Sequence, residues 1–148
     1  MTSLASLVRE PIDSMAVIRA VSSRANGAVL LFLGAVRHVN DGRDVTGIDY
    51  AAYEAMAQRE LNAIVAEGAA RFGTRDVAIV HRLGELSVED VSVAIAVGHP
   101  HRDTAYALSR WVIEELKRRV PIWKREHYVD GTREWVDPTG HRREGAPT

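Results

Sequence analysis

The sequence of 148 residues contains no cysteine and only two lysines. The absence of cysteine excludes disulfides, thiol catalysis and cysteine-ligated zinc sites, and it fits a reducing compartment. No stretch has the apolar length of a membrane span. The N-terminal stretch carries acidic residues and lacks the apolar run of a signal peptide. We therefore expect a cytoplasmic protein that does not use a membrane.

Several common sequence motifs are also missing. We find no phosphate-binding glycine loop, no dinucleotide-binding glycine fingerprint, no zinc-protease helix motif and no Gly-x-Ser-x-Gly elbow. The formal net charge is −1, which gives no general case for nucleic acid as a partner. With 46% hydrophobic and 26% charged residues, the composition is that of one globular domain.

The two lysines lie close together, whereas the other seventeen cationic residues are arginines spread along the chain. Lys117 and Lys124 fall in a single segment, 117–126. A lysine amine can lose its proton and act as a nucleophile or base, which a guanidinium does not do. A bias towards arginine explains why lysine is rare, but not why both lysines are neighbours. Amines with a functional role need a local environment that adapts them to it, and two lysines in one segment could share such an environment. A functional pair and a chance pair therefore both remain open interpretations.

The hydrophobic pattern predicts an α+β domain with a mostly antiparallel sheet. One short helix is expected between Pro11 and Asn26, and two longer helices over 53–72 and 103–119. Strands are expected over 28–36, 45–51, 77–83, 91–97, 122–129 and 133–136. We expect the strand 28–36 to be buried on both faces, and the small residues on one face of 91–97 to admit a closely packed helix. The domain is expected to span residues 1–137, with a loose tail over 138–148.

Cationic side chains follow two of these strands. Arg37 follows the first buried strand, and His101 and Arg102 precede the last helix. An arginine guanidinium can form two parallel hydrogen bonds with a phosphate or a carboxylate. The free backbone N–H groups at the start of a helix also bind anions. At each of these positions, a side chain that simply faces solvent remains the alternative interpretation. His99 and His101 could also bind a metal ion, but the sequence shows no third ligand for it. His81 is expected to be a hydrogen-bonded histidine of the sheet or core.

Eight motifs, in order along nearly the whole chain, resemble one known family. They are Phe32-x-Gly34-x-Val36-Arg37, Tyr53 with Met56-Ala57, His81-Arg82-x-Gly84-x-Leu86, Ser92-Val93, His101-Arg102, Leu116-Lys117, Val120-Pro121-Ile122-Trp123-Lys124-Arg125-Glu126, and Asp130-Gly131 with Trp135-Val136. This pattern resembles the large, catalytic subunit of molybdopterin synthase.

The resemblance implies an α/β hammerhead-type fold with a small β-rich subdomain. It implies a homodimer of large subunits, each binding a small ubiquitin-like sulfur carrier, so that the complete assembly is a heterotetramer. The carrier's C-terminal Gly-Gly thiocarboxylate would transfer sulfur in two steps to cyclic pyranopterin monophosphate, forming the dithiolene of molybdopterin. The sulfur-transfer step needs no metal and no separate cofactor.

The resemblance also assigns residues. The family's two active-site lysines fall on Lys117 and Lys124, and its substrate-phosphate contacts fall on Arg37, His101 and Arg102. Part of that pocket is expected across the dimer interface. Two positions depart from the family pattern: Glu89 replaces a glycine that is usual in a hairpin turn, where we expect altered local geometry, and Ala51 replaces an acidic residue.

The sequence leaves two competing hypotheses. One is a non-catalytic module of the same fold that docks a ubiquitin-like carrier, which the presence of both lysines disfavours. The other is a small RNA-binding α+β domain that uses Arg118, Arg119 and Arg125. The net charge and the shortage of aromatic residues for base stacking argue against it.

Overall fold

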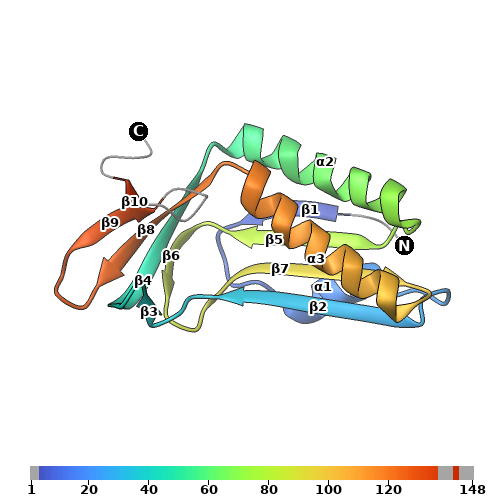
Figure 1. Ribbon diagram of the computed structural model, residues 1–148, viewed down its shortest axis with the longest axis horizontal. Helices are drawn as coiled ribbons and strands as arrows, with labels where there is room; N and C mark the ends of the chain where they lie inside the picture. The colour runs from blue at the N-terminus through green and yellow to red at the C-terminus, as the bar shows by residue number, and fades with distance from the viewer. Residues whose placement is uncertain (1–3, 137–141, 144–148) are drawn as a thin grey trace.

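The computed structural model describes residues 4–136 and 142–143. These residues form two β-sheets and three helices (Figure 1). The first sheet has the strand order β1-β5-β7-β2. Its strands are β1 (Leu4–Val8), β5 (Val77–Arg82), β7 (Val91–His99) and β2 (Ala28–Ala35). Only β1 and β5 form a parallel pair among the described strands; the other pairings are antiparallel.

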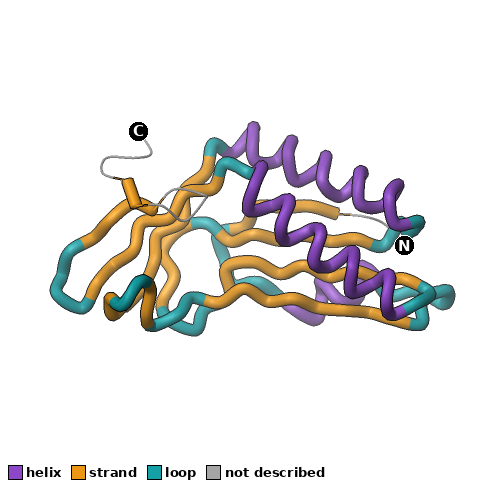
Figure 2. Tube along the Cα trace, viewed as in Figure 1, coloured by secondary structure: helices purple, strands orange, loops and turns teal. Residues whose placement is uncertain are grey.

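Two long helices cover one face of this sheet: α2 (Glu54–Phe72) and α3 (Arg102–Arg119) (Figure 2). Their apolar stripes pack against β5 and β7 in the main core, where Leu61, Ile64 and Leu108 are fully buried. Burying a side chain of this size contributes roughly 1.5–3 kcal/mol. Helix α2 ends at Gly73, which takes the left-handed conformation (φ 70°) that glycine adopts without steric cost.

The opposite face of the sheet is covered by the short helix α1 (Ser14–Val21), capped by the Asp13 side chain. Val17 and Val21 of α1 pack against Ala94 and Ala96 of β7. Small side chains on that face therefore admit a closely packed helix, as the alternation in this strand predicted.

The second sheet is smaller and forms the β-rich subdomain. It has the order β10-β9-β8-β4-β3, with β6 pairing beside β4. The strands are β3 (Val39–Asn40), β4 (Arg43–Ala52), β6 (Gly84–Ser87), β8 (Ile122–Tyr128), β9 (Arg133–Val136) and β10 (Arg142–Arg143). A second small core, which includes Val36, Ile48 and Leu86, underlies it. The predicted α+β class with a mostly antiparallel sheet and a β-rich subdomain is confirmed.

The structure differs from the sequence-based expectation at several strands. β2 is an edge strand, so Val29, Phe32 and Leu33 are 37–41% exposed, and the prediction of burial on both faces was wrong. The short strands β1, β3, β6 and β10 were not predicted. Most of the tail expected over 138–148 lies outside the described residues; its two described residues form β10. Within the described residues, no helix has both the length and the apolar character needed to cross a bilayer.

Candidate functional site

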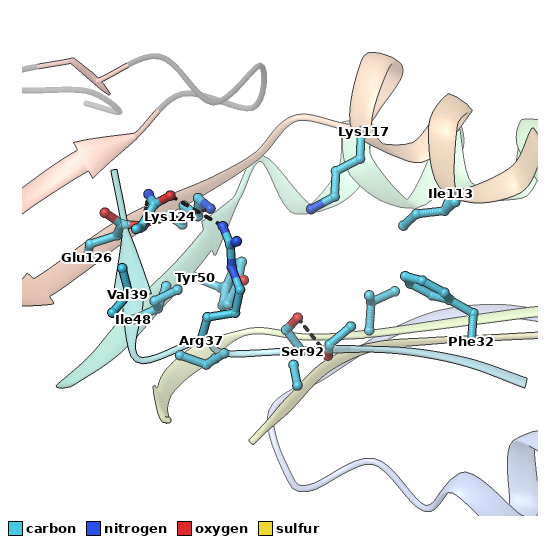
Figure 3. Close-up of a pocket in the computed structure, with 15 residues that line it drawn as sticks. Phe32, Arg37, Val39, Ile48, Tyr50, Ser92, Ile113, Lys117, Lys124 and Glu126 are labelled. Atoms are coloured by element: carbon cyan, nitrogen blue, oxygen red, sulfur yellow. Dashed lines mark hydrogen bonds and ion pairs between the residues drawn. The ribbon is translucent and has the colours of Figure 1, made fainter. Parts of the chain in front are cut away.

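A pocket of about 160 Å³ lies between the C-terminal end of α3, the end of β2 and the inner face of the second sheet (Figure 3). Three cationic side chains line it: Arg37, Lys117 and Lys124. Apolar side chains, including Phe32 and Ile113, form the wall on the side of β2 and α3. The pocket is therefore a small cationic cleft with one apolar wall.

The local structure of the segment from the end of α3 to the start of β8 places each lysine at the pocket. Lys117 lies in the last turn of α3, directly after the buried Leu116. The chain turns at Pro121 and enters β8, where Lys124 pairs across the sheet with Tyr50 of β4. Residues directly opposite each other on neighbouring strands share a face. The helix end, the proline corner and the strand start thus bring both amines to one pocket.

The environment of Lys117 lowers the pKa of its amine. Its amine points into the pocket (Figure 3), although the residue stays exposed because the pocket is open to solvent. Burial of the amine, and then the positive charges of Lys124 and Arg37, lower the pKa of Lys117. A lysine with a lowered pKa holds more neutral amine near neutral pH, which is the form that acts as a nucleophile or base.

A buried carboxylate supports the other two cations. Glu126 is only 1% exposed. Its carboxylate accepts hydrogen bonds from Asn40 Nδ2 at 2.6 Å and from the Tyr128 hydroxyl at 2.8 Å, and it lies 4.0 Å from Lys124 Nζ. Asn40 Oδ1 in turn accepts a hydrogen bond of 3.4 Å from Arg37. Glu126 therefore holds Lys124 directly and Arg37 through Asn40.

Buried polar side chains line and back the pocket between the two sheets. Tyr50 lines it and forms a hydrogen bond with Ser92; burial raises the pKa of Tyr50, an effect that this bond partly offsets. The Tyr50 ring meets the ring of His81 edge-on at 5.2 Å. Burial lowers the pKa of His81 to about 4, with a further contribution from Lys117 that also lowers it, so this histidine is neutral at pH 7. It is 3% exposed and its Nδ1 lies 2.9 Å from the Arg82 carbonyl, which confirms the predicted hydrogen-bonded core histidine.

His101 and Arg102 do not join this pocket within one chain. Arg102 begins α3 and Lys117 lies in its last turn, so the two are separated by about 22 Å along the helix axis. Both residues line a separate depression with Gly27, Pro100 and Asp103. The single anion-accepting cleft expected from the sequence is therefore divided between two ends of one helix.

The outer face of the second sheet carries a different charged cluster. The donor atoms of Asp49, Glu85 and His127 lie within 4.8 Å of one another, the spacing of a possible metal site. However, Asp49 Oδ2 already accepts hydrogen bonds from Arg125 at 2.6 Å and His127 at 2.8 Å. Burial would raise the pKa of Asp49, but these bonds outweigh it and lower the pKa. A guanidinium at the carboxylate takes the place of a metal ion, so we interpret this cluster as a structural ion network.

Sequence reasoning missed Asn40, Tyr50, Ser92 and Glu126 as parts of the pocket. Only one of them carried a signal: Glu126 alternates with Lys124 along a predicted strand, which places both on one face. The other three reach the pocket through pairings between distant segments.

An α+β domain with two amines and an arginine in one pocket has the features of a group-transfer enzyme that handles an anionic substrate. Comparison with known proteins identifies the family. The family model described as "MoaE protein" matches residues 7–119, and the chain belongs to this family. Among curated relatives, a molybdopterin synthase catalytic subunit of Halalkalibacterium halodurans is 41% identical over 95% of this chain and 92% of its own length. A molybdopterin synthase catalytic subunit of Emericella nidulans is 45% identical over 78% of this chain. The match covers 59% of that longer protein.

Solved structures give the same result. Molybdopterin synthase from Staphylococcus aureus superposes with a TM-score of 0.83 at 36% identity, over 87% of this chain and 93% of that one. A complex of subunits 1 and 2 of molybdopterin-converting factor from Helicobacter pylori matches with a TM-score of 0.74. That match covers 96% of each chain at 20% identity and supports the fold alone.

Proposed function

We propose that this chain is the catalytic subunit of a molybdopterin synthase, a sulfurtransferase of molybdenum cofactor biosynthesis. The observation that carries the proposal is the convergence of Lys117, Lys124 and Arg37 in one pocket of a MoaE-family fold. The sulfur donor is the thiocarboxylate at the C-terminal Gly-Gly of a small ubiquitin-like carrier, and the acceptor is cyclic pyranopterin monophosphate. Both reactants are anions, which a cationic pocket attracts.

The two lysines have different surroundings, and we assign them different roles on that basis. Lys117 has a lowered pKa, so it is the amine that acts as a base or as a covalent partner of the carrier's terminal carbonyl. Lys124 is held by the Glu126 carboxylate and acts as a fixed positive charge for the anion that develops during sulfur transfer. Arg37, tied to Asn40, serves as a fork for the substrate phosphate.

We further propose that the active site is completed in a homodimer. His101 and Arg102 are substrate-phosphate residues in this assignment, yet they lie at the far end of α3 from Lys117. A two-fold axis beside the β2 edge would place that end of one subunit against the pocket of the other. β2 suits such an interface because it is an edge strand with exposed Val29, Phe32 and Leu33.

A carrier bound to each large subunit would make a heterotetramer. The carrier's extended C-terminus can enter the pocket because the pocket is open to solvent. The Helicobacter pylori protein of the same fold was solved in a complex of two subunits, and we propose a small partner subunit here by analogy with that complex. We place the reaction in the cytoplasm, where a cysteine-free chain meets a reducing environment.

Reconstitution tests the reaction. The protein is mixed with thiocarboxylated carrier and cyclic pyranopterin monophosphate, and the dithiolene product is followed by mass spectrometry. Wild type should form product and Lys117→Ala should lose nearly all of it. Arg118→Ala is the matched control, because Arg118 neighbours Lys117 but pairs with Glu115 outside the pocket. Carrier binding without any product would favour the non-catalytic docking module instead.

Mixing two inactive variants tests the shared site. Lys117→Ala and Arg102→Ala subunits, each inactive alone, are denatured together and refolded in equal amounts. Half of the resulting dimers are mixed, and each mixed dimer has one site with both residues intact, so about a quarter of wild-type activity should return. No recovery from mixed dimers that have demonstrably formed would show that Arg102 does not serve the partner's site.

A further inference from the structure

The turn between β7 and α3 is held by His99, which lies outside the pocket that contains Lys117. His99 is the last residue of β7 and is 8% exposed. Its Nδ1 lies 2.9 Å from the backbone nitrogen of His101, and its Nε2 lies 3.1 Å from the carbonyl oxygen of Phe72. One buried ring thus connects the end of α2 with the start of α3.

These two contacts determine where the ring carries its proton. The His101 backbone N–H is a donor, so Nδ1 of His99 must accept and carries no hydrogen. The Phe72 carbonyl is an acceptor, so Nε2 must carry the hydrogen and donate it. His99 is therefore a neutral ring with one tautomer. Both of its nitrogens are occupied, which removes it from any metal-ligand set with His101.

The turn that these two hydrogen bonds hold is closely packed against neighbouring backbone. Phe72 is the last residue of α2, where carbonyl groups lack a partner within the helix. His101 is the N-cap of α3, and its own side chain makes no capping hydrogen bond. On the other side of the turn, a Cβ atom at Gly27 would come within 2.6 Å of the Pro100 carbonyl oxygen. The turn is thus held between Gly27 and the His99 ring.

We propose that His99 is a positioning residue that fixes the direction in which His101 and Arg102 leave the β7–α3 turn. Both side chains are exposed, and neither makes a hydrogen bond or ion pair in the described part of the chain. The His101 ring also lies 5.9 Å from the His99 ring, and the backbone of the turn sets the direction in which both side chains leave it. The proposal rests on the proposed function, in which these two residues bind the substrate phosphate. It adds that their geometry is transmitted from His99 through the His101 backbone amide.

Two substitutions separate the two contacts. In His99→Asn, the side-chain oxygen occupies the δ position and can still accept from the His101 amide, but nothing reaches Phe72. In His99→Gln, an amide nitrogen at the ε position can still donate to Phe72, but the contact with His101 is lost. We expect His99→Gln to raise the KM for cyclic pyranopterin monophosphate about tenfold, since a lost hydrogen bond of this kind has that scale. Its kcat should stay within about twofold, and His99→Asn should keep both constants within about twofold of wild type.

The result that would overturn the proposal is equal KM values in wild type, His99→Asn and His99→Gln, with a change in stability alone. A Gln variant that keeps its KM while Asn loses it would also overturn it, because the anchor to Phe72 would then be the contact that matters. Calorimetric titration with cyclic pyranopterin monophosphate gives the same comparison without turnover, so it decides the matter even if reconstitution fails. Nitrogen-15 spectra of the His99 ring check the tautomer independently of substrate: a proton on Nδ1 would contradict the mechanism.

Discussion

Replacing Glu89 with glycine should stabilise the protein. Glu89 lies in the turn from Ser87 to Asp90, closed by a hydrogen bond of 3.0 Å from the Asp90 nitrogen to the Ser87 carbonyl. Its φ is 77°, the value of the third position of a type II turn, which strongly favours glycine. The backbone at Glu89 therefore takes a conformation that glycine favours, although this chain has glutamate there.

The size of the effect follows from two opposing costs. A side chain in the left-handed region costs roughly 1–2 kcal/mol, which glycine avoids. Glycine also loses roughly 0.5–1 kcal/mol more conformational entropy on folding than a residue with a side chain. Glu89 is exposed, and its side chain makes no hydrogen bond or ion pair with the described residues. The difference is a gain of about 0–1.5 kcal/mol in the free energy of unfolding. The middle of that range, about 0.75 kcal/mol, corresponds to a rise in Tm of about 2–3 °C for a domain of this size.

Urea unfolding of wild type, Glu89→Gly and Glu89→Ala measures this effect. Alanine removes the glutamate side chain but keeps the backbone strain, so it is the matched control and should leave the midpoint nearly unchanged. Glycine should raise the midpoint with an unchanged m-value. If glycine and alanine gave the same midpoint, or if glycine lowered it, the positive φ would carry no strain and the reasoning would be refuted.

Three other predictions concern charged groups. Glu126→Ala should destabilise the protein by about 3 kcal/mol in urea unfolding, because it leaves Lys124 and Asn40 without their buried partner. Labelled lysine gives only two side-chain NMR signals: that of Lys117 should titrate below the usual lysine pKa, and Lys124→Met should raise it by removing a positive neighbour. The pKa of Asp49 is lowered in the folded state, so the ionised carboxylate contributes to stability above its unfolded pKa of about 4, and this contribution is lost as the pH falls through the folded pKa. In Asp49→Asn, the free energy of unfolding should therefore decrease less than in wild type as the pH is lowered through this range.

Local patterns in the sequence were enough to place both lysines. A helix that ends before a proline, followed by an alternating strand, fixes the approximate path of the chain from Lys117 to Lys124. The same kind of information predicted the small face of β7 and its packing against α1. Each of these features depends on residues close together in the chain, where period and turn chemistry are strong guides.

Features that depend on distant pairings could not be predicted in this way. Glu126 meets Asn40 only because β8 pairs with β4 in one register, and a shift of one residue would turn Glu126 to the other face. β1 was missed because a run of five residues carries little periodicity, and its partner β5 lies far along the chain. The strand β2 was misread because an apolar edge strand has the same composition as a central one.

That misreading of β2 and the division of the anion-binding residues have a common explanation. An edge strand with three exposed apolar side chains is costly to leave in water unless something covers it. The pocket with Lys117 lacks the two residues that lie at the opposite end of α3. One symmetric dimer across β2 would account for both features. It would bury the apolar edge, and it would reverse the direction of α3 in the second subunit, so that the start of that helix lies beside the end that carries Lys117 in the first. In that arrangement catalysis depends on assembly, so a substitution that weakens the β2 interface, such as Leu33→Asp, should remove activity while Lys117 and Lys124 stay in place.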